Sequence, residues 1–325
     1  MTREYAPPKK PITRNAGTIF LVLLLFFCLA LMLRRADIAT NCMRNGLILC
    51  ARTIVPSLFP FMVLSEILVS SNAGEYFISP LIHPLGKRIG FSHAGCCAIV
   101  LGLICGFPIG ARCAISSYEK GRMEKEECER VLACSSIPSP AFLISTVGTT
   151  LWQDTKFGIF LYISLITSAL LGGILLYVLQ KRGKKEAGTI STPTSVKIKF
   201  EANMFSSAIR NATLNTLFVC AYIVFFATLT GTVEIVLGRF ARNEIMHTIV
   251  TAFLELSGGV SAAAQLSGKK LAAILTGATV GWSGLSVHCQ MLSFTDKHDI
   301  NLRPYFISKL LQMILCACMA LMFQK

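Results

Sequence analysis

Charged residues are scarce in this chain. Asp, Glu, Lys and Arg make up 15% of its 325 residues, whereas apolar residues make up 53%. Soluble domains carry about 25% charged residues, so a soluble protein of this size would lack the polar surface that it needs. The composition therefore excludes an ordinary soluble protein and predicts a chain that folds in lipid.

Motifs for catalysis and metal binding are also missing. The sequence has no G-x-S-x-G elbow, no H-E-x-x-H pair and no Walker loop, and its 5 histidines share no ligand spacing. The 13 cysteines include no C-x-x-C pair, and most lie within apolar runs, where a free thiol acts as a small apolar filler. We therefore predict a protein that is not an enzyme and that needs neither a metal nor a cofactor.

The net charge is +14, yet the basic residues do not form one soluble face, and we do not expect a nucleic-acid partner. Many of them lie in the polar connector 181–203, which the positive-inside rule places in the cytoplasm, where anionic lipid is the expected contact. These residues are Lys181, Arg182, Lys184, Lys185, Lys197 and Lys199.

Long uncharged runs predict the architecture. Six runs are long enough to cross about 30 Å of hydrocarbon, and three more contain a single charged residue. The six are 17–33, 89–111, 131–153, 157–179, 211–233 and 271–295, and the three are 53–71 with Glu66, 245–266 with Glu255 and 305–323 with Lys309. We expect an all-α polytopic membrane protein with about 8–10 transmembrane or half-membrane helices.

Glycine interrupts two of these runs at the same spacing of 175 positions. Gly102 and Gly106 correspond to Gly277 and Gly281, and Phe107 and Cys113 correspond to Trp282 and His288. Broken helices are tolerated in lipid only where they line an enclosed cavity, and a matched pair in two halves marks a transporter's substrate site. The polar stretch 135–140 predicts a third break at the same cavity.

The spacing predicts two internally repeated halves around one cavity. The expected divisions are a disordered tail 1–16, an anchor helix 17–36, a first half 37–153, a connecting helix 154–180, the basic linker 181–203 and a second half 204–325. Whether the halves are parallel or inverted is left open.

The broken helices predict a site for an anion, because each helix N-terminus offers free N–H groups and a positive dipole end. The candidate substrate-binding residues are Gly106, Phe107, Pro108, Gly110, Arg112, Ser135, Ser136, Ser139, Gly281, Trp282, Ser283, Ser286, His288 and Gln290. Glu66 and Glu255 are candidates for coupling or for an ion pair with Arg112. Two alternatives stay open: the glycines serve only close helix packing, and Arg112 reaches the membrane interface instead of a ligand.

An ordered set of motifs resembles a known family. The motifs are 56–61 with Glu66, 106–111 followed by 118–121, 139–142, and 284–288 with Gln290. The set resembles the sporulation integral membrane proteins of the YlbJ type, which carry the nucleoside-recognition, or Gate, domain. The resemblance implies a multi-pass protein of the mother-cell-derived outer forespore membrane of an endospore-forming bacterium, and passage of dipicolinate toward the forespore.

Three functions are compatible with the sequence. The first is a transporter or channel for a small organic anion, held between the broken helices. The second is a non-transporting scaffold for spore cortex or envelope assembly, which recruits other proteins through its basic linker. The third is a Gate-type transporter of a nucleoside or a metal ion. The lipid bilayer is an expected partner in each case, and a homo-oligomer and other spore membrane proteins are left open.

Overall fold

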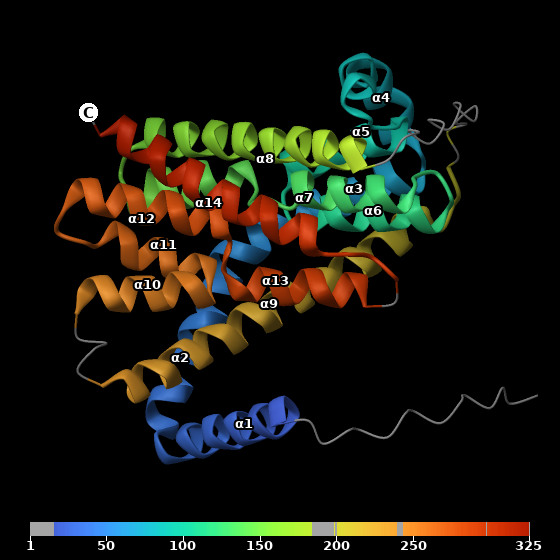
Figure 1. Cartoon of the computed structure of the whole chain (residues 1–325). Coiled ribbons are helices and arrows are strands. Elements are labelled where there is room, and N and C mark those ends of the chain that lie inside the picture. The colour runs from blue at the N-terminus through green and yellow to red at the C-terminus, as the bar shows by residue number, and fades with distance from the viewer. Residues whose placement is uncertain (1–15, 184–197, 199, 239–242, 297, 325) are drawn as a thin grey trace, which may run out of the picture.

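The computed structural model describes residues 16–183, 198, 200–238, 243–296 and 298–324. Every regular element in these residues is helical (Figure 1), so the expected all-α class is confirmed. The expected disordered tail, apart from its last residue, and most of the basic linker, including Lys184, Lys185, Lys197 and Lys199, lie outside the described residues. The expected anchor corresponds to α1 (Ala16–Arg34), which contacts α2 and α9 at one side of the bundle.

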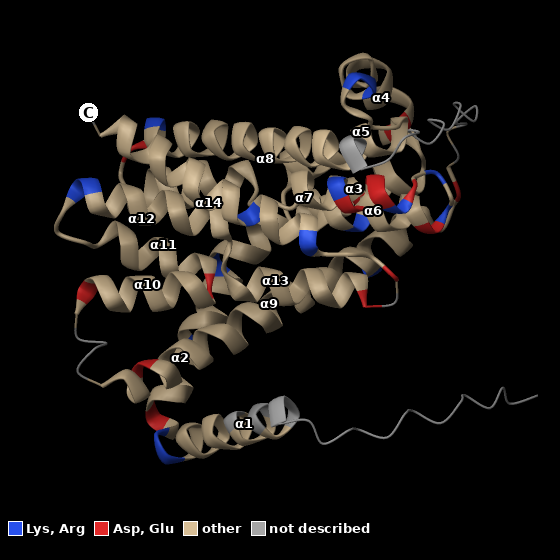
Figure 2. Cartoon of the chain, viewed as in Figure 1, with Lys and Arg blue, Asp and Glu red and all other residues tan. Residues whose placement is uncertain are grey.

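Four runs of helix in the described residues are long and apolar enough to cross a membrane. The first is Ala36–Ser70, which consists of α2 (Ala36–Leu49), the π-helical η1 (Cys50–Ile54) and α3 (Val55–Ser70). The others are α8 (Thr155–Gly183), α9 (Met204–Leu237) and α14 (Arg303–Phe323). Figure 2 shows their charged residues mainly near helix ends and connections, as a lipid environment requires.

A bent helix pair makes a fifth candidate span when the pair is counted as one span. It consists of α4 (Ala73–Gly86) with the short helix η2 (Lys87–Ile89), followed by α5 (His93–Cys105) at an angle of 107°. The described residues thus form four or five candidate full spans. The sequence predicts about 8–10 helices, but that number counts transmembrane and half-membrane helices together.

The remaining apolar runs are divided into short helices. They form α6 (Ile109–Glu119), α7 (Lys125–Ser135), the π-helical η3 (Ala141–Leu151), α10 (Glu244–Leu254), α11 (Leu256–Ala264), α12 (Lys269–Trp282) and α13 (Gly284–Thr295). The helices α5 and α6 fold back on each other as a hairpin, and so do α10 and α11. By contrast, α7 and η3 do not pack side by side as a hairpin, and neither do α12 and α13.

The long helix α14 is the axis on which these parts assemble. It packs along α12 and α8 and also contacts α7, as the neighbouring ribbons in Figure 1 show. Close approach to α12 is possible because Gly277 and Gly281 face the backbone of α14. A Cβ atom added to Gly281 would lie 2.4 Å from the carbonyl oxygen of Gln312. Small residues at such interfaces let membrane helices approach closely.

Candidate functional site

Three helix N-termini meet at one cavity, which we call the central cavity. It has a volume of about 80 Å³ and lies where η3, α11 and α13 begin, beside Phe107 at the tip of the α5–α6 hairpin. Its polar lining consists of Ser57, Ser136, Ser139, Glu255, Ser257, Ser283, Ser286 and Gln290, and apolar side chains of α3 and α9 close it. Segments from both halves of the sequence therefore contribute to one cavity, in which polar side chains lie within a mainly apolar lining.

The first break separates α5 from α6. Gly106 ends α5 with a positive φ of 79°, a conformation that favours glycine. A Cβ atom there would lie 2.6 Å from the backbone nitrogen of Ser139. The next residue, Phe107, donates its N–H to the carbonyl of Ile137 at 2.7 Å and lines the central cavity. These contacts join the tip of the α5–α6 hairpin to the break after α7.

The second break lies between α7 and η3. Residues 136–139 are not helical, and Pro138 and Pro140 lack the N–H that a continuous helix would use. The hydroxyl of Ser139 accepts the N–H of Phe142 at 3.3 Å and so caps η3. The hydroxyl of Ser136 has no hydrogen-bond partner although this residue is fully buried and lines the central cavity.

The third break, at Glu255, is one that the sequence reasoning missed. Glu255 is extended, with φ −144° and ψ 133°, and its carboxylate accepts the N–H of Gly258 at 2.6 Å. It therefore acts as the N-cap of α11. The sequence signal was an acid three residues before a glycine pair, inside a run without proline.

The fourth break lies between α12 and α13. Ser283 and Gly284 both have positive φ, 73° and 81°, and interrupt the helix between α12 and α13. The hydroxyl of Ser283 donates to the carbonyl of Val280 at 3.2 Å. Ser286 and Gln290 follow on the first turns of α13, and all three polar residues line the central cavity.

The electrostatics of the central cavity favour negative charge. Each helix N-terminus carries a partial positive charge of about half an elementary charge and N–H groups without intrahelical partners. Of the three N-termini, that of α13 has no side-chain cap, whereas the Ser139 hydroxyl caps η3 and the Glu255 carboxylate caps α11. The hydroxyl of Ser136 and the amide oxygen of Gln290 also lack partners, and an amide can present either its NH₂ or its oxygen to a ligand. The central cavity thus offers donors that are not already used.

Arg112 does not reach the central cavity. Its guanidinium lies 3.9 Å from Glu66, whose carboxylate also accepts the amide N–H of Asn211 at 2.8 Å. Arg112 and Glu66 line a second cavity of about 70 Å³, between α3, α6 and α9, to which α9 contributes Asn215. Of the two acids expected to pair with Arg112, Glu66 does so, whereas Glu255 lines the central cavity.

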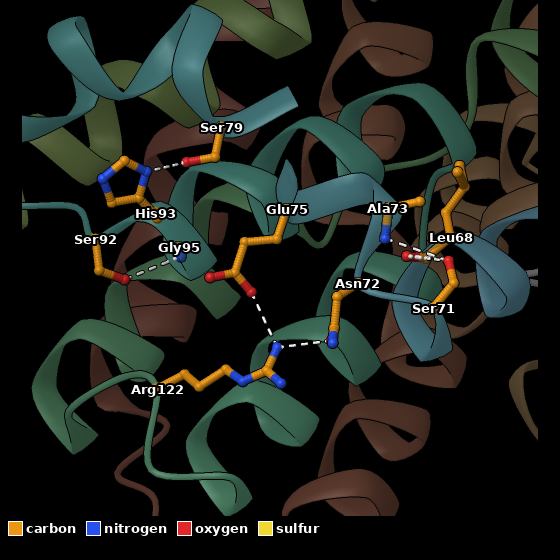
Figure 3. Close-up of polar contacts among 10 residues, drawn as sticks. All are labelled: Leu68, Ser71, Asn72, Ala73, Glu75, Ser79, Ser92, His93, Gly95 and Arg122. Atoms are coloured by element: carbon orange, nitrogen blue, oxygen red, sulfur yellow. Dashed lines mark hydrogen bonds and ion pairs between the residues drawn. The ribbon is translucent and has the colours of Figure 1, made fainter. Parts of the chain in front are cut away.

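A third, smaller cavity of about 20 Å³ adjoins the second one. Val69, Cys113 and Ser116 line both, and the smaller cavity is large enough for a water molecule. At its far wall Arg122 donates to Asn72 at 2.8 Å and to Glu75 at 3.1 Å, as Figure 3 shows. The polar groups around Arg112 and Arg122 therefore line two adjoining cavities that are separate from the central cavity, and Ile109 at the start of α6 lines the second cavity.

Trp282 and His288 are used in packing. The indole N–H of Trp282 donates to the carbonyl of Phe253 at 3.1 Å, and the two rings stack. His288 lies 2.8 Å from the hydroxyl of Tyr305 through Nδ1 and contacts the edge of Trp282. Neither side chain lines the central cavity.

Most of the candidate glycines also face packing contacts. Gly110 lies against Gly102 and Ser135, where an added Cβ would be 2.6–2.8 Å from the nearest atoms. Gly281 faces the α14 backbone as described above. Pro108 begins α6 without lining the central cavity. Of the fourteen candidate substrate-binding residues, the central cavity therefore gathers Phe107, Ser136, Ser139, Ser283, Ser286 and Gln290.

Lys309 stands out in the sequence only as the single charged residue in the apolar run 305–323. It lies in α14 and is fully buried. Its ammonium donates to the carbonyl of Ser136 at 2.6 Å, the hydroxyl of Ser283 at 3.0 Å and the side-chain oxygen of Gln312 at 3.2 Å. A sequence signal existed, because Tyr305, Ser308, Lys309 and Gln312 fall on one face of an otherwise apolar helix.

Comparisons with known proteins support the membrane assignment. No known family model and no solved structure matches the chain. The chain is 21% identical to the sporulation integral membrane protein YlbJ of Bacillus subtilis (strain 168), in an alignment that covers 95% of this chain and 83% of that protein. The expected Gate domain stays a prediction. The chain is thus a multi-pass helical membrane protein with distant, nearly full-length homology to a sporulation integral membrane protein.

Proposed function

We propose that this protein is a membrane transporter or channel for a small organic anion, which binds in the central cavity. The observation that supports the proposal is the convergence of three helix N-termini on one cavity whose lining includes unpartnered polar groups. Helix N-termini favour anions through their free N–H groups and their dipoles. In transporters, such half-helix ends meet at the substrate near the middle of the bilayer.

The same observation ranks the alternatives. A metal ion would gain little from helix N-termini, whose N–H groups are donors and not ligands. A neutral nucleoside would use the hydroxyls and Gln290 but not the dipoles. An anion uses both, so it fits the central cavity better than either alternative.

The proposed substrate is a planar dicarboxylate, of which dipicolinate is the candidate. This step rests on the homologue's name, which links the chain to sporulation, and on the resemblance to the YlbJ type. Two carboxylates match a chamber in which helix ends come from two separate parts of the chain. We accordingly propose the outer forespore membrane as the location.

We propose that Glu255 couples binding to a proton. It is the one charged residue in the described lining of the central cavity, and its carboxylate occupies the N-terminus of α11. A charged Glu255 repels an incoming anion, whereas a protonated Glu255 does not. Anion and proton would then bind together.

We also propose an internal repeat, in a register different from the spacing of 175. In the first half, the α5–α6 hairpin is followed by the broken pair α7 and η3 and then by the long helix α8. In the second half, the α10–α11 hairpin is followed by the broken pair α12 and α13 and then by α14. The spacing of 175 positions instead matches the break in the α5–α6 hairpin with the break between α12 and α13.

Uptake into proteoliposomes tests the proposed function. Purified protein should take up labelled pyridine-2,6-dicarboxylate in a saturable way, with less uptake of the neutral diamide and of uridine, relative to empty liposomes. Preferred uptake of uridine would favour the nucleoside alternative. Absence of all uptake and binding, with a normally folded protein, would favour the scaffold.

A further inference from the structure

The environment of Lys309 resembles a cation site. Its three acceptors are a carbonyl, a hydroxyl and an amide oxygen, at 2.6, 3.0 and 3.2 Å. An ammonium has three N–H donors and no acceptor, so these oxygens use its full capacity. Neutral oxygens of this kind are also the ligands that hard metal cations prefer.

No carboxylate neutralises Lys309. In the part of the chain that the structure describes, no Asp or Glu forms an ion pair with its ammonium, although the side chain is fully buried in an apolar span. An unpaired charge at such a position is costly and marks a functional residue by default.

The helix dipoles around Lys309 explain the sign of its charge. Ser136 follows the last residue of α7 and accepts through its carbonyl, whereas Ser283 lies between the end of α12 and the start of α13 and accepts through its hydroxyl. Helix C-termini carry partial negative charge and favour cations. In transporters with broken helices, such C-terminal ends and unwound carbonyls hold the coupling cation.

The same two residues form the wall of the central cavity. Ser136 and Ser283 line that cavity and also accept hydrogen bonds from Lys309. The pair α7 and η3 thus presents the carbonyl after α7 to Lys309 and the start of η3 to the central cavity, and the pair α12 and α13 presents the Ser283 hydroxyl to Lys309 and the start of α13 to the central cavity. Ser136 and Ser283 therefore separate the ammonium from the proposed anion site.

We propose that the Lys309 ammonium is a tethered cation, which fills the place of an exchangeable alkali-metal ion at the ends of α7 and α12. Anion binding in the central cavity then requires neither Na⁺ nor K⁺. The inference rests on the proposed function for its link to the anion, but the cation site itself does not depend on the anion's identity. A tethered cation cannot leave with the substrate, so a proton is the cation that remains available for coupling.

The wild-type protein gives the first test. Binding of pyridine-2,6-dicarboxylate should have the same affinity in NaCl, in KCl and in N-methyl-D-glucamine chloride at equal ionic strength. A requirement for Na⁺ or K⁺ would overturn the proposal.

Two variants of Lys309 give the second test. Lys309→Ala opens the site and should lose about tenfold or more in affinity in N-methyl-D-glucamine chloride, with partial recovery in Na⁺, K⁺ or methylammonium. Lys309→Met fills the space without a charge and should lose affinity without recovery. Wild-type affinity in Lys309→Met, or absence of recovery in a folded Lys309→Ala, would contradict the proposal.

Thermal unfolding separates this inference from the proposed function, because it needs no anion. In detergent, Na⁺, K⁺ or methylammonium should raise the unfolding midpoint of Lys309→Ala by about 2 °C or more and leave that of the wild type unchanged. If these shifts appear while no anion binds, the tethered cation stands and the proposed substrate class is wrong. If anions bind but the cations do not shift Lys309→Ala, the tethered cation is wrong.

Discussion

Ser135 and Ser136 form a natural matched pair for the proposed anion site. Both are fully buried, and both hydroxyls lack a hydrogen-bond partner. Only Ser136 lines the central cavity, whereas Ser135 packs against Gly102 and Gly110. The two alanine substitutions therefore each remove a hydroxyl without a hydrogen-bond partner, one inside and one outside the central cavity.

We expect Ser136→Ala to weaken anion binding specifically. A hydrogen bond to a charged group contributes about 1.5–3 kcal/mol, which corresponds to about a 10- to 150-fold loss of affinity. The stability of the protein without ligand should stay unchanged or rise slightly, because the substitution removes a hydroxyl that has no partner. The carbonyl of Ser136, which accepts from Lys309, is retained in the variant.

The assay is calorimetric titration of the purified protein in detergent with pyridine-2,6-dicarboxylate, beside a thermal unfolding curve for each variant. Ser135→Ala should bind as the wild type does. Equal losses in the two variants would mean that the substitutions act through packing, and an unchanged affinity in Ser136→Ala would refute the placement of the anion in the central cavity.

Three further results are expected. Arg112→Gln should bind the anion with wild-type affinity in the same titration, since Arg112 pairs with Glu66 in the second cavity; a loss like that of Ser136→Ala would contradict this. Gly106→Ala should lower the thermal unfolding midpoint more than Gly121→Ala. Both positions have positive φ, but only at Gly106 would the new Cβ clash with a neighbour, at a cost of about 1–3 kcal/mol beyond the backbone strain. Equal shifts of the midpoint would show that the neighbouring residue moves to accommodate the new Cβ. Trp282→Phe should lower the midpoint, because it loses the indole hydrogen bond, and keep the affinity; reduced affinity would instead support ring stacking on a ligand.

The helical class and three of the four breaks could be predicted from local sequence. Apolar runs without charge require helices in lipid, and the breaks at Gly106, at Pro138 and Pro140 and after Gly281 lie where glycine or proline weakens a helix. The break at Glu255 could not be seen in this way, because no proline marks it. An extended acid that caps the following helix looks in the sequence like an acid embedded in a span.

Which residues form the site depends on contacts between distant parts of the chain. Arg112 lies one helical turn after Pro108, but its side chain leaves α6 on the face toward Glu66. Lys309 gains its role from Ser136 and Ser283, which are 173 and 26 positions away. The sequence indicates that such residues are expensive in a membrane, but not which partner stabilises each one.

The most direct test of the anion site is to locate a bound dicarboxylate. A crystal of the protein with 4-iodopyridine-2,6-dicarboxylate would give an anomalous iodine signal that marks the ligand. We expect the signal in the central cavity, with the carboxylates near Ser136 and the N-terminus of α13. A signal beside Arg112 in the second cavity, or none at ligand concentrations that saturate binding in solution, would contradict the proposed site.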